Sequence, residues 1–103
     1  MEYLVRIDIR LPIEMDDEVR SDLYVAEAER AKSLASEGLL VRMWRIPGRR
    51  ANWGLWRTPD ATTLHEALSS LPLWKYSSVE VTALARHPGD PASDAEDTDR
   101  TKK

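Results

Sequence analysis

The stretch from Glu37 to Trp56 restricts the fold of this 103-residue chain more than any other part. It reads as two strands, residues 39–46 and 50–56, because the Pro-Gly pair between them favours a tight turn. It holds three of the four tryptophans and four arginines, with Arg57 just beyond its end. A hairpin with this much aromatic and cationic surface predicts a functional role in addition to a structural one.

Helices are predicted on both sides of the hairpin. Residues 16–37 carry an apolar stripe at helical spacing, and Gly38 suits the C-terminal end because glycine reaches the left-handed conformation without steric cost. Thr58-Pro59-Asp60 predicts the second helix start, with a hydroxyl cap followed by proline at the first position. Pro72 is expected to end that helix.

The outer strands complete the fold class. Residues 2–11 alternate apolar with charged side chains, which predicts a half-buried strand, and residues 76–85 predict a fourth. The order β-α-β-β-α-β is that of an α+β, ferredoxin-like sandwich, with two helices on one face of a four-stranded antiparallel sheet. The other face is expected to pack against a second copy, as in a dimeric α+β barrel. We expect one domain over residues 1–87 and a disordered acidic tail over residues 88–103.

Composition excludes several classes of function. The net charge is −3, and the last sixteen residues, with five acids and three bases, supply −2 of it, so the body is nearly neutral. Nucleic-acid binding needs a cationic surface, and a membrane span needs about 20 apolar residues, which no run approaches. The absence of cysteine and the two distant histidines give no metal-ligand spacing. We therefore expect a cytoplasmic protein without nucleic-acid, membrane or metal binding.

Glu27 interrupts the apolar stripe of the first helix, and Tyr24 lies one turn before it. In one interpretation Glu27 sits at the edge of the stripe, where it reaches water or pairs with an arginine, as most charged residues do. In the other it is partly buried in an apolar pocket, and its pKa is raised toward that of a useful general base. Arg20 also falls within this arc, so the stripe is imperfect.

Residues 44–52, WRIPGRRAN, resemble the W-R-I-x-G-x-x-A-N signature of the muconolactone delta-isomerase family. The resemblance extends without an insertion from residue 1 to about residue 88. Its further matches are Leu11-Pro12, Met15-Asp16, Glu27, Glu37-Gly38, Leu64-His65, Leu71-Pro72-Leu73 and Arg86-His87-Pro88.

This resemblance implies a cofactor-free isomerase of aromatic catabolism. The family converts muconolactone into the 3-oxoadipate enol-lactone of the β-ketoadipate pathway by moving a proton and a double bond. Its members assemble as dimers into a decamer, with active sites at subunit interfaces. The expected partners of this chain are thus a small lactone carboxylate and further copies of itself.

The same resemblance suggests the site residues. Glu27 is the candidate base, and Tyr24 is a candidate hydrogen-bond donor beside it. A developing charge on the lactone oxygen needs a donor, and the substrate carboxylate needs a cation. The candidates for substrate binding are Arg42, Arg45, Asn52, Trp44 and Trp56. A structural alternative for Arg45 is an ion pair with Asp8 or Glu80.

The chain departs from the family pattern at two places. The resemblance implies a lysine where this chain has Tyr24, and an arginine-histidine pair where it has Val41-Arg42. Three alternatives therefore stay open. The first is chloride removal from a chlorinated muconolactone, and the second is other cofactor-free proton or oxygen chemistry with Glu27 as base. The third is a non-catalytic, oligomeric ligand-binding or scaffold protein.

Overall fold

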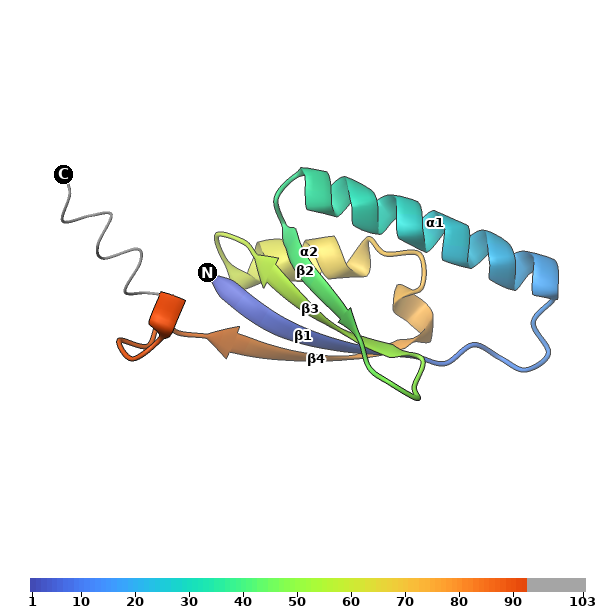
Figure 1. Cartoon of the computed structure of the whole chain (residues 1–103). Helices are drawn as coiled ribbons and strands as arrows, with labels where there is room; N and C mark the ends of the chain where they lie inside the picture. Colours follow the sequence, from blue (N-terminus) through green and yellow to red (C-terminus); the bar gives the residue numbers. More distant parts are fainter. Residues whose placement is uncertain (93–103) are drawn as a thin grey trace.

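Four strands form one antiparallel sheet in the order β2-β3-β1-β4, and two helices cover one face of it (Figure 1). The computed structural model describes residues 1–92, so most of the predicted tail, residues 88–103, lies outside the described residues. The strands are β1 (Glu2–Ile9), β2 (Leu40–Arg45), β3 (Ala51–Arg57) and β4 (Ser77–Leu84). The helices are α1 (Asp17–Ser36) and α2 (Ala61–Ser69), and a short 3₁₀ turn, η1 (Trp74–Tyr76), precedes β4. The predicted ferredoxin-like α+β fold is confirmed.

The central strand β1 decides which side chains of its neighbours face the helices. Tyr3, Val5 and Ile7 are buried, as the alternation in the sequence predicts. Antiparallel pairing sets them opposite Trp56, Gly54 and Asn52 of β3, so these three residues share the helix-covered face. β1 ends at Ile9, two residues earlier than predicted.

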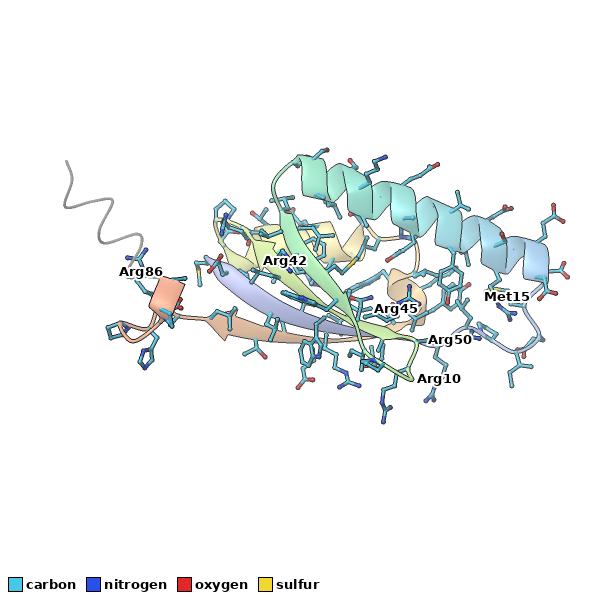
Figure 2. All side chains as sticks on the ribbon, viewed as in Figure 1. Arg10, Met15, Arg42, Arg45, Arg50 and Arg86 are labelled. Carbon is cyan, nitrogen blue, oxygen red and sulfur yellow. The ribbon has the colours of Figure 1, made fainter. Side chains whose placement is uncertain are left out.

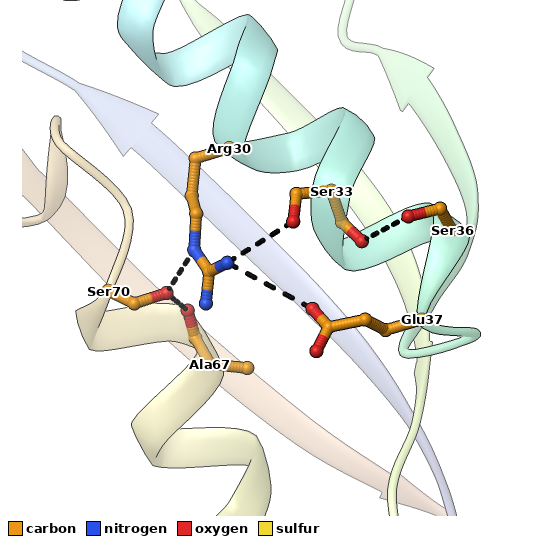
Figure 3. Close-up of polar contacts among 6 residues, drawn as sticks. All are labelled: Arg30, Ser33, Ser36, Glu37, Ala67 and Ser70. Atoms are coloured by element: carbon orange, nitrogen blue, oxygen red, sulfur yellow. Dashed lines mark hydrogen bonds and ion pairs between the residues drawn. The ribbon is translucent and has the colours of Figure 1, made fainter.

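The core fills the space between this face and the helices. Its helical members are Leu34 from α1 and three residues of α2: Leu64, Ala67 and Leu68. A polar contact joins the C-terminal ends of the two helices (Figure 3): Arg30 Nε donates to Ser70 Oγ at 2.9 Å, and Arg30 Nη1 lies 3.9 Å from Glu37 Oε2. These contacts fix α1 across the sheet, and with it the side chains that it directs toward the hairpin.

The two predicted glycine positions are confirmed, whereas the start of α2 differs from the prediction. Gly38 follows α1 with a φ of +83°, and Gly48 forms the hairpin turn with a φ of +78°. The N-cap of α2 is Asp60, not Thr58, because the Asp60 carboxylate accepts a 2.8 Å hydrogen bond from Thr63 N. The Thr58 hydroxyl donates instead to the carbonyl of Asp60.

An irregularity in β2 changes which of its side chains face the helices. Leu40 pairs with Trp56 but Arg42 pairs with Leu55, so one extra residue lies between them as a β-bulge. Leu40, Met43 and Arg45 consequently share the helix-covered face, while Arg42 and Trp44 lie on the open face. A regular strand of period two would place Leu40 and Trp44 on the same face, and the bulge places them on opposite faces.

Candidate active site

Glu27 lies in the middle of α1 and is held by the loop that follows α2. The backbone N–H of Leu73 donates to Glu27 Oε1 at 2.9 Å. Burial raises the pKa of the Glu27 carboxyl, and the hydrogen bond from Leu73 opposes this shift to a smaller extent. Of the two interpretations of Glu27, the geometry favours the partly buried carboxylate, because the structure gives it no arginine partner among the described residues.

A small cavity of about 20 Å³ adjoins this carboxylate, enough for about one water molecule. Its lining is mostly apolar and comes from α1, from strands β1, β2 and β3, and from the segment that follows α2. The residues are Ile7, Glu27, Ala31, Leu40, Met43, Asn52, Gly54, Trp56 and Leu71. The absence of a side chain at Gly54 leaves room for the Trp56 ring, because a Cβ at Gly54 would lie 2.7 Å from Trp56 Nε1.

A larger, open pocket of about 720 Å³ lies between the first half of α1 and the turn end of the hairpin. Met43 and Asn52 line both spaces, so the two adjoin. The remaining lining residues are Ile9, Arg20, Tyr24, Trp44, Arg45, Arg49, Arg50 and Ala51. Four of the lining residues are arginines and none of them is acidic. The pocket is therefore suited to an anionic ligand that reaches inward toward Glu27.

The structure brings six of the seven predicted site residues to these adjoining spaces. Glu27 lines the inner cavity, Tyr24 and Arg45 line the outer pocket, and Asn52 lines both. Asn52 and Arg45 are direct cross-strand partners, so their side chains are neighbours on the same face. Arg45 makes no ion pair among the described residues, and Asp8 pairs with Arg6 instead.

The two predicted tryptophans also border these spaces, whereas Arg42 does not. Trp56 is only 2% exposed and forms a wall of the inner cavity. Trp44 borders the outer pocket, but its side chain lies on the open face of the sheet. There the Arg42 guanidinium stacks over the Trp44 ring, 5.0 Å from the ring centroid. Arg42 lines neither space, and Figure 2 shows it well along β2 from Arg45.

The sequence analysis assigned neither Arg20 nor the turn arginines, Arg49 and Arg50, to the substrate site, although both turn arginines belong to the cationic hairpin that it identified. Arg20 lies one turn before Tyr24 and two turns before Glu27, a spacing that the imperfect stripe of α1 already contained. Arg49 and Arg50 reach the pocket from the turn (Figure 2 labels Arg50). Their positions depend on where the turn lies relative to α1, which no local pattern records.

The described part of the chain contains neither a cluster of metal-binding side chains nor a helix that could span a membrane. Over residues 1–92, no group of three or more histidine, cysteine or acidic side chains is placed to hold a metal ion. Neither of the helices in this range has the length and apolar character needed to cross a membrane.

Known proteins resemble this chain in sequence and in structure. The sequence model described as muconolactone delta-isomerase matches residues 1–90. Muconolactone Delta-isomerase of Pseudomonas aeruginosa is 38% identical over 88 residues, which cover 85% of this chain and 92% of that protein. Muconolactone Delta-isomerase 2 of Acinetobacter lwoffii is 39% identical over 100 residues, covering 97% of this chain and 100% of the relative.

Solved structures show the same relationship. The crystal structure of a muconolactone isomerase superposes with a TM-score of 0.83 and 36% identity, covering 88% of this chain and 95% of that one. The 5-chloro-2-hydroxyhydroquinone dehydrochlorinase of Burkholderia phenoliruptrix AC1100 superposes with a TM-score of 0.65 at 15% identity, over 84% and 96% of the two chains. The second likeness concerns the fold alone.

Proposed function

This chain belongs to the muconolactone delta-isomerase family and is an isomerase, and we propose that it acts on muconolactone or a closely related unsaturated lactone. The product is then the 3-oxoadipate enol-lactone, formed within aromatic catabolism by the β-ketoadipate pathway. The observation that carries this proposal for the site is the half-buried Glu27 carboxylate, with its raised pKa, beside a cavity that opens toward a cationic pocket.

The reaction requires a base that removes a proton from one carbon and returns it to another. The substrate is a five-membered unsaturated lactone with an acetate side chain, and removal of the ring proton gives a dienolate-like state. Glu27 takes the proton as a carboxylate and, once protonated, delivers it to the second carbon. A raised pKa suits both steps, because the carboxylate is a stronger base and the carboxylic acid persists long enough to return the proton.

The charge that develops on the lactone oxygen needs a hydrogen-bond donor. The Asn52 amide lines both the Glu27 cavity and the outer pocket, so it can donate to a ring held between them. Arg45, its cross-strand neighbour, offers two parallel hydrogen bonds to the acetate carboxylate. The Tyr24 hydroxyl supplies a further donor without a positive charge, and the buried Trp56 limits the depth of the site.

We propose also that the active form is a cytoplasmic homo-oligomer, built from dimers into a decamer. The open face of the sheet supports this, since large apolar side chains remain there without cover in the single chain. Trp44 is 42% exposed and Leu84 is 40% exposed. Light scattering on the purified protein tests the number of subunits.

Turnover of muconolactone by the purified protein, without added cofactor and with a metal chelator present, tests the function. We expect conversion to the enol-lactone, followed by ¹H NMR. Release of chloride from a chlorinated muconolactone, with no conversion of muconolactone itself, would favour dehalogenation. Binding of both lactones without conversion of either would overturn the isomerase proposal in favour of a ligand-binding role.

A further inference from the structure

Arg20 lines the outer pocket from the side of helix α1. It lies on α1 seven residues before Glu27, which places the two side chains on the same side of the helix and about 10 Å apart along its axis. Its side chain is 29% exposed and lines the pocket together with Tyr24 and Arg45. Arg20 approaches from the helix, whereas Arg45 approaches from the sheet.

The contacts of Arg20 in this structure leave part of its guanidinium unsatisfied. Nη2 donates to the carbonyl of Pro12 at 3.2 Å, and Nη1 reaches the fully exposed carboxylate of Asp17 at 3.3 Å. Arg20 Nε is buried and has no hydrogen-bond partner among the described residues. A buried N–H donor without an acceptor is unfavourable, and the ion pair to an exposed aspartate stabilises little. A carboxylate in the pocket therefore offers this guanidinium a better partner than it has now.

We propose that Arg20 is a further substrate-binding residue, which rotates toward the pocket and binds the substrate carboxylate opposite Arg45. This inference rests on the proposed function, because it assigns a ligand to the same site. The two guanidinium groups hold the carboxylate from opposite sides, so the lactone ring is directed inward to Glu27 and Asn52. Arg20 thus makes the site selective for lactones that carry an acid over their neutral analogues.

The electrostatics of the pocket agree with this role. Arg49 and Arg50 line the same space, and no acidic residue of the lining neutralises the four cations. The acid nearest to Arg20, Asp17, points to solvent and is not part of the lining. A bound carboxylate would be attracted by each of these cations, whereas a neutral lactone has no charge for them to attract.

Calorimetric titration of muconolactone tests the proposal. The protein is the full chain with Glu27→Gln, so that the ligand binds without turnover. Adding Arg20→Met should raise Kd by roughly 10- to 100-fold, the effect expected for losing hydrogen bonds to a charged group. Arg20→Lys should recover part of the loss, because it restores the charge without the planar fork. The methyl ester of muconolactone should bind both proteins equally weakly.

Arg30→Met is the matched control, because it also removes a guanidinium from helix α1. The Arg30 guanidinium donates to Ser70 and Ser33, and Arg30 lines neither the cavity nor the pocket. This substitution should leave Kd unchanged. An unchanged Kd for Arg20→Met, or an equal loss for the methyl ester, would overturn the role of Arg20.

Turnover by the wild-type protein, measured separately, distinguishes this failure from failure of the proposed function. Turnover with an unchanged Kd for Arg20→Met overturns Arg20 alone. Tight binding that Arg20→Met weakens, without wild-type turnover, overturns the isomerase proposal and supports Arg20. Absence of both binding and wild-type turnover overturns both.

Discussion

Replacing Glu27 by glutamine and, separately, by alanine should separate its chemical role from its structural one. The carboxylate is the proposed base, and Glu27 Oε1 also accepts the hydrogen bond from Leu73 N at 2.9 Å. Leu73 is only 1% exposed, so its N–H is buried and loses its acceptor if this carboxylate is removed. Glutamine keeps an oxygen at that position but cannot accept the substrate proton. Alanine removes both the base and the acceptor.

The magnitudes follow from these contacts. Both variants should lose roughly 10²- to 10⁴-fold in kcat, the usual contribution of a positioned general base. Glutamine should leave the free energy of unfolding at neutral pH unchanged or raise it by up to about 1 kcal/mol, since an amide carries no charge to desolvate. Alanine should lower it by about 1–3 kcal/mol, because a buried N–H is left without an acceptor.

The difference in the free energy of unfolding between the Glu27→Gln variant and the wild type should depend on pH, and the raised pKa of Glu27 gives its sign. Burial raises the pKa of Glu27 in the folded state, so the folded protein prefers the protonated carboxyl more than the unfolded chain does. The contribution of Glu27 to stability is therefore present at low pH and is lost as the pH rises through its folded pKa. Because glutamine does not titrate, its advantage over the wild type should be absent below the unfolded pKa, grow as the pH rises, and be complete above the folded pKa.

Urea denaturation across pH, together with turnover of the three proteins, provides the assay. Substantial turnover by Glu27→Gln would refute the assignment of the base. Equal stability of the glutamine and alanine variants would show that the bond to Leu73 does not hold the loop. A glutamine variant that loses stability at neutral pH would refute the argument from desolvation.

Three further predictions concern single positions. The value of kcat/KM should rise with pH through the pKa of Glu27, above the usual range of a glutamate, because only the ionised carboxylate accepts a proton; a pH-rate profile with a midpoint in the ordinary range would contradict this. Gly54→Ala should lower stability by about 1–3 kcal/mol in urea denaturation, because its Cβ would lie 2.7 Å from Trp56 Nε1, and an unchanged unfolding midpoint would show that the ring can move freely. Asp60→Ala should lower stability by about 1 kcal/mol, whereas Asp60→Asn should preserve it, since either an aspartate or an asparagine can accept from Thr63 N.

Local patterns predicted the parts of the fold that local physics determines. The alternation in β1 gave the correct buried face, because period two follows from the pleat of any strand. Gly38 and Gly48 marked a helix end and a turn, because both adopt a positive φ. The start of α2 was predicted two residues too early, because Thr58 and Asp60 are both good capping residues and only the hydrogen bonds of the folded chain distinguish them.

The site was less accessible to sequence reasoning, because contacts between distant residues build it. The partner of Glu27 is a backbone N–H 46 positions away, which no side-chain pattern reveals. In the sequence Arg20 is only an irregularity in the apolar stripe of α1. Its role in the pocket depends on the hairpin turn, which lies beside it in the fold. The side chains of Arg42 and Arg45 could not be sorted between faces without the register of β2 against β3.

The bulge in β2 has a consequence for how chain length can vary in relatives and in engineered variants. The half of β2 after the bulge, with Met43 and Arg45, is held in register by the turn at Gly48. The half before it supplies Leu40 to the core. Loss of Val41 by deletion should straighten the strand while both halves keep their faces, whereas an insertion between Met43 and Arg45 would send one of them to the opposite face. The strand is therefore expected to tolerate a change of length at Val41, whereas a change of length after Met43 would move a side chain of the site to the wrong face.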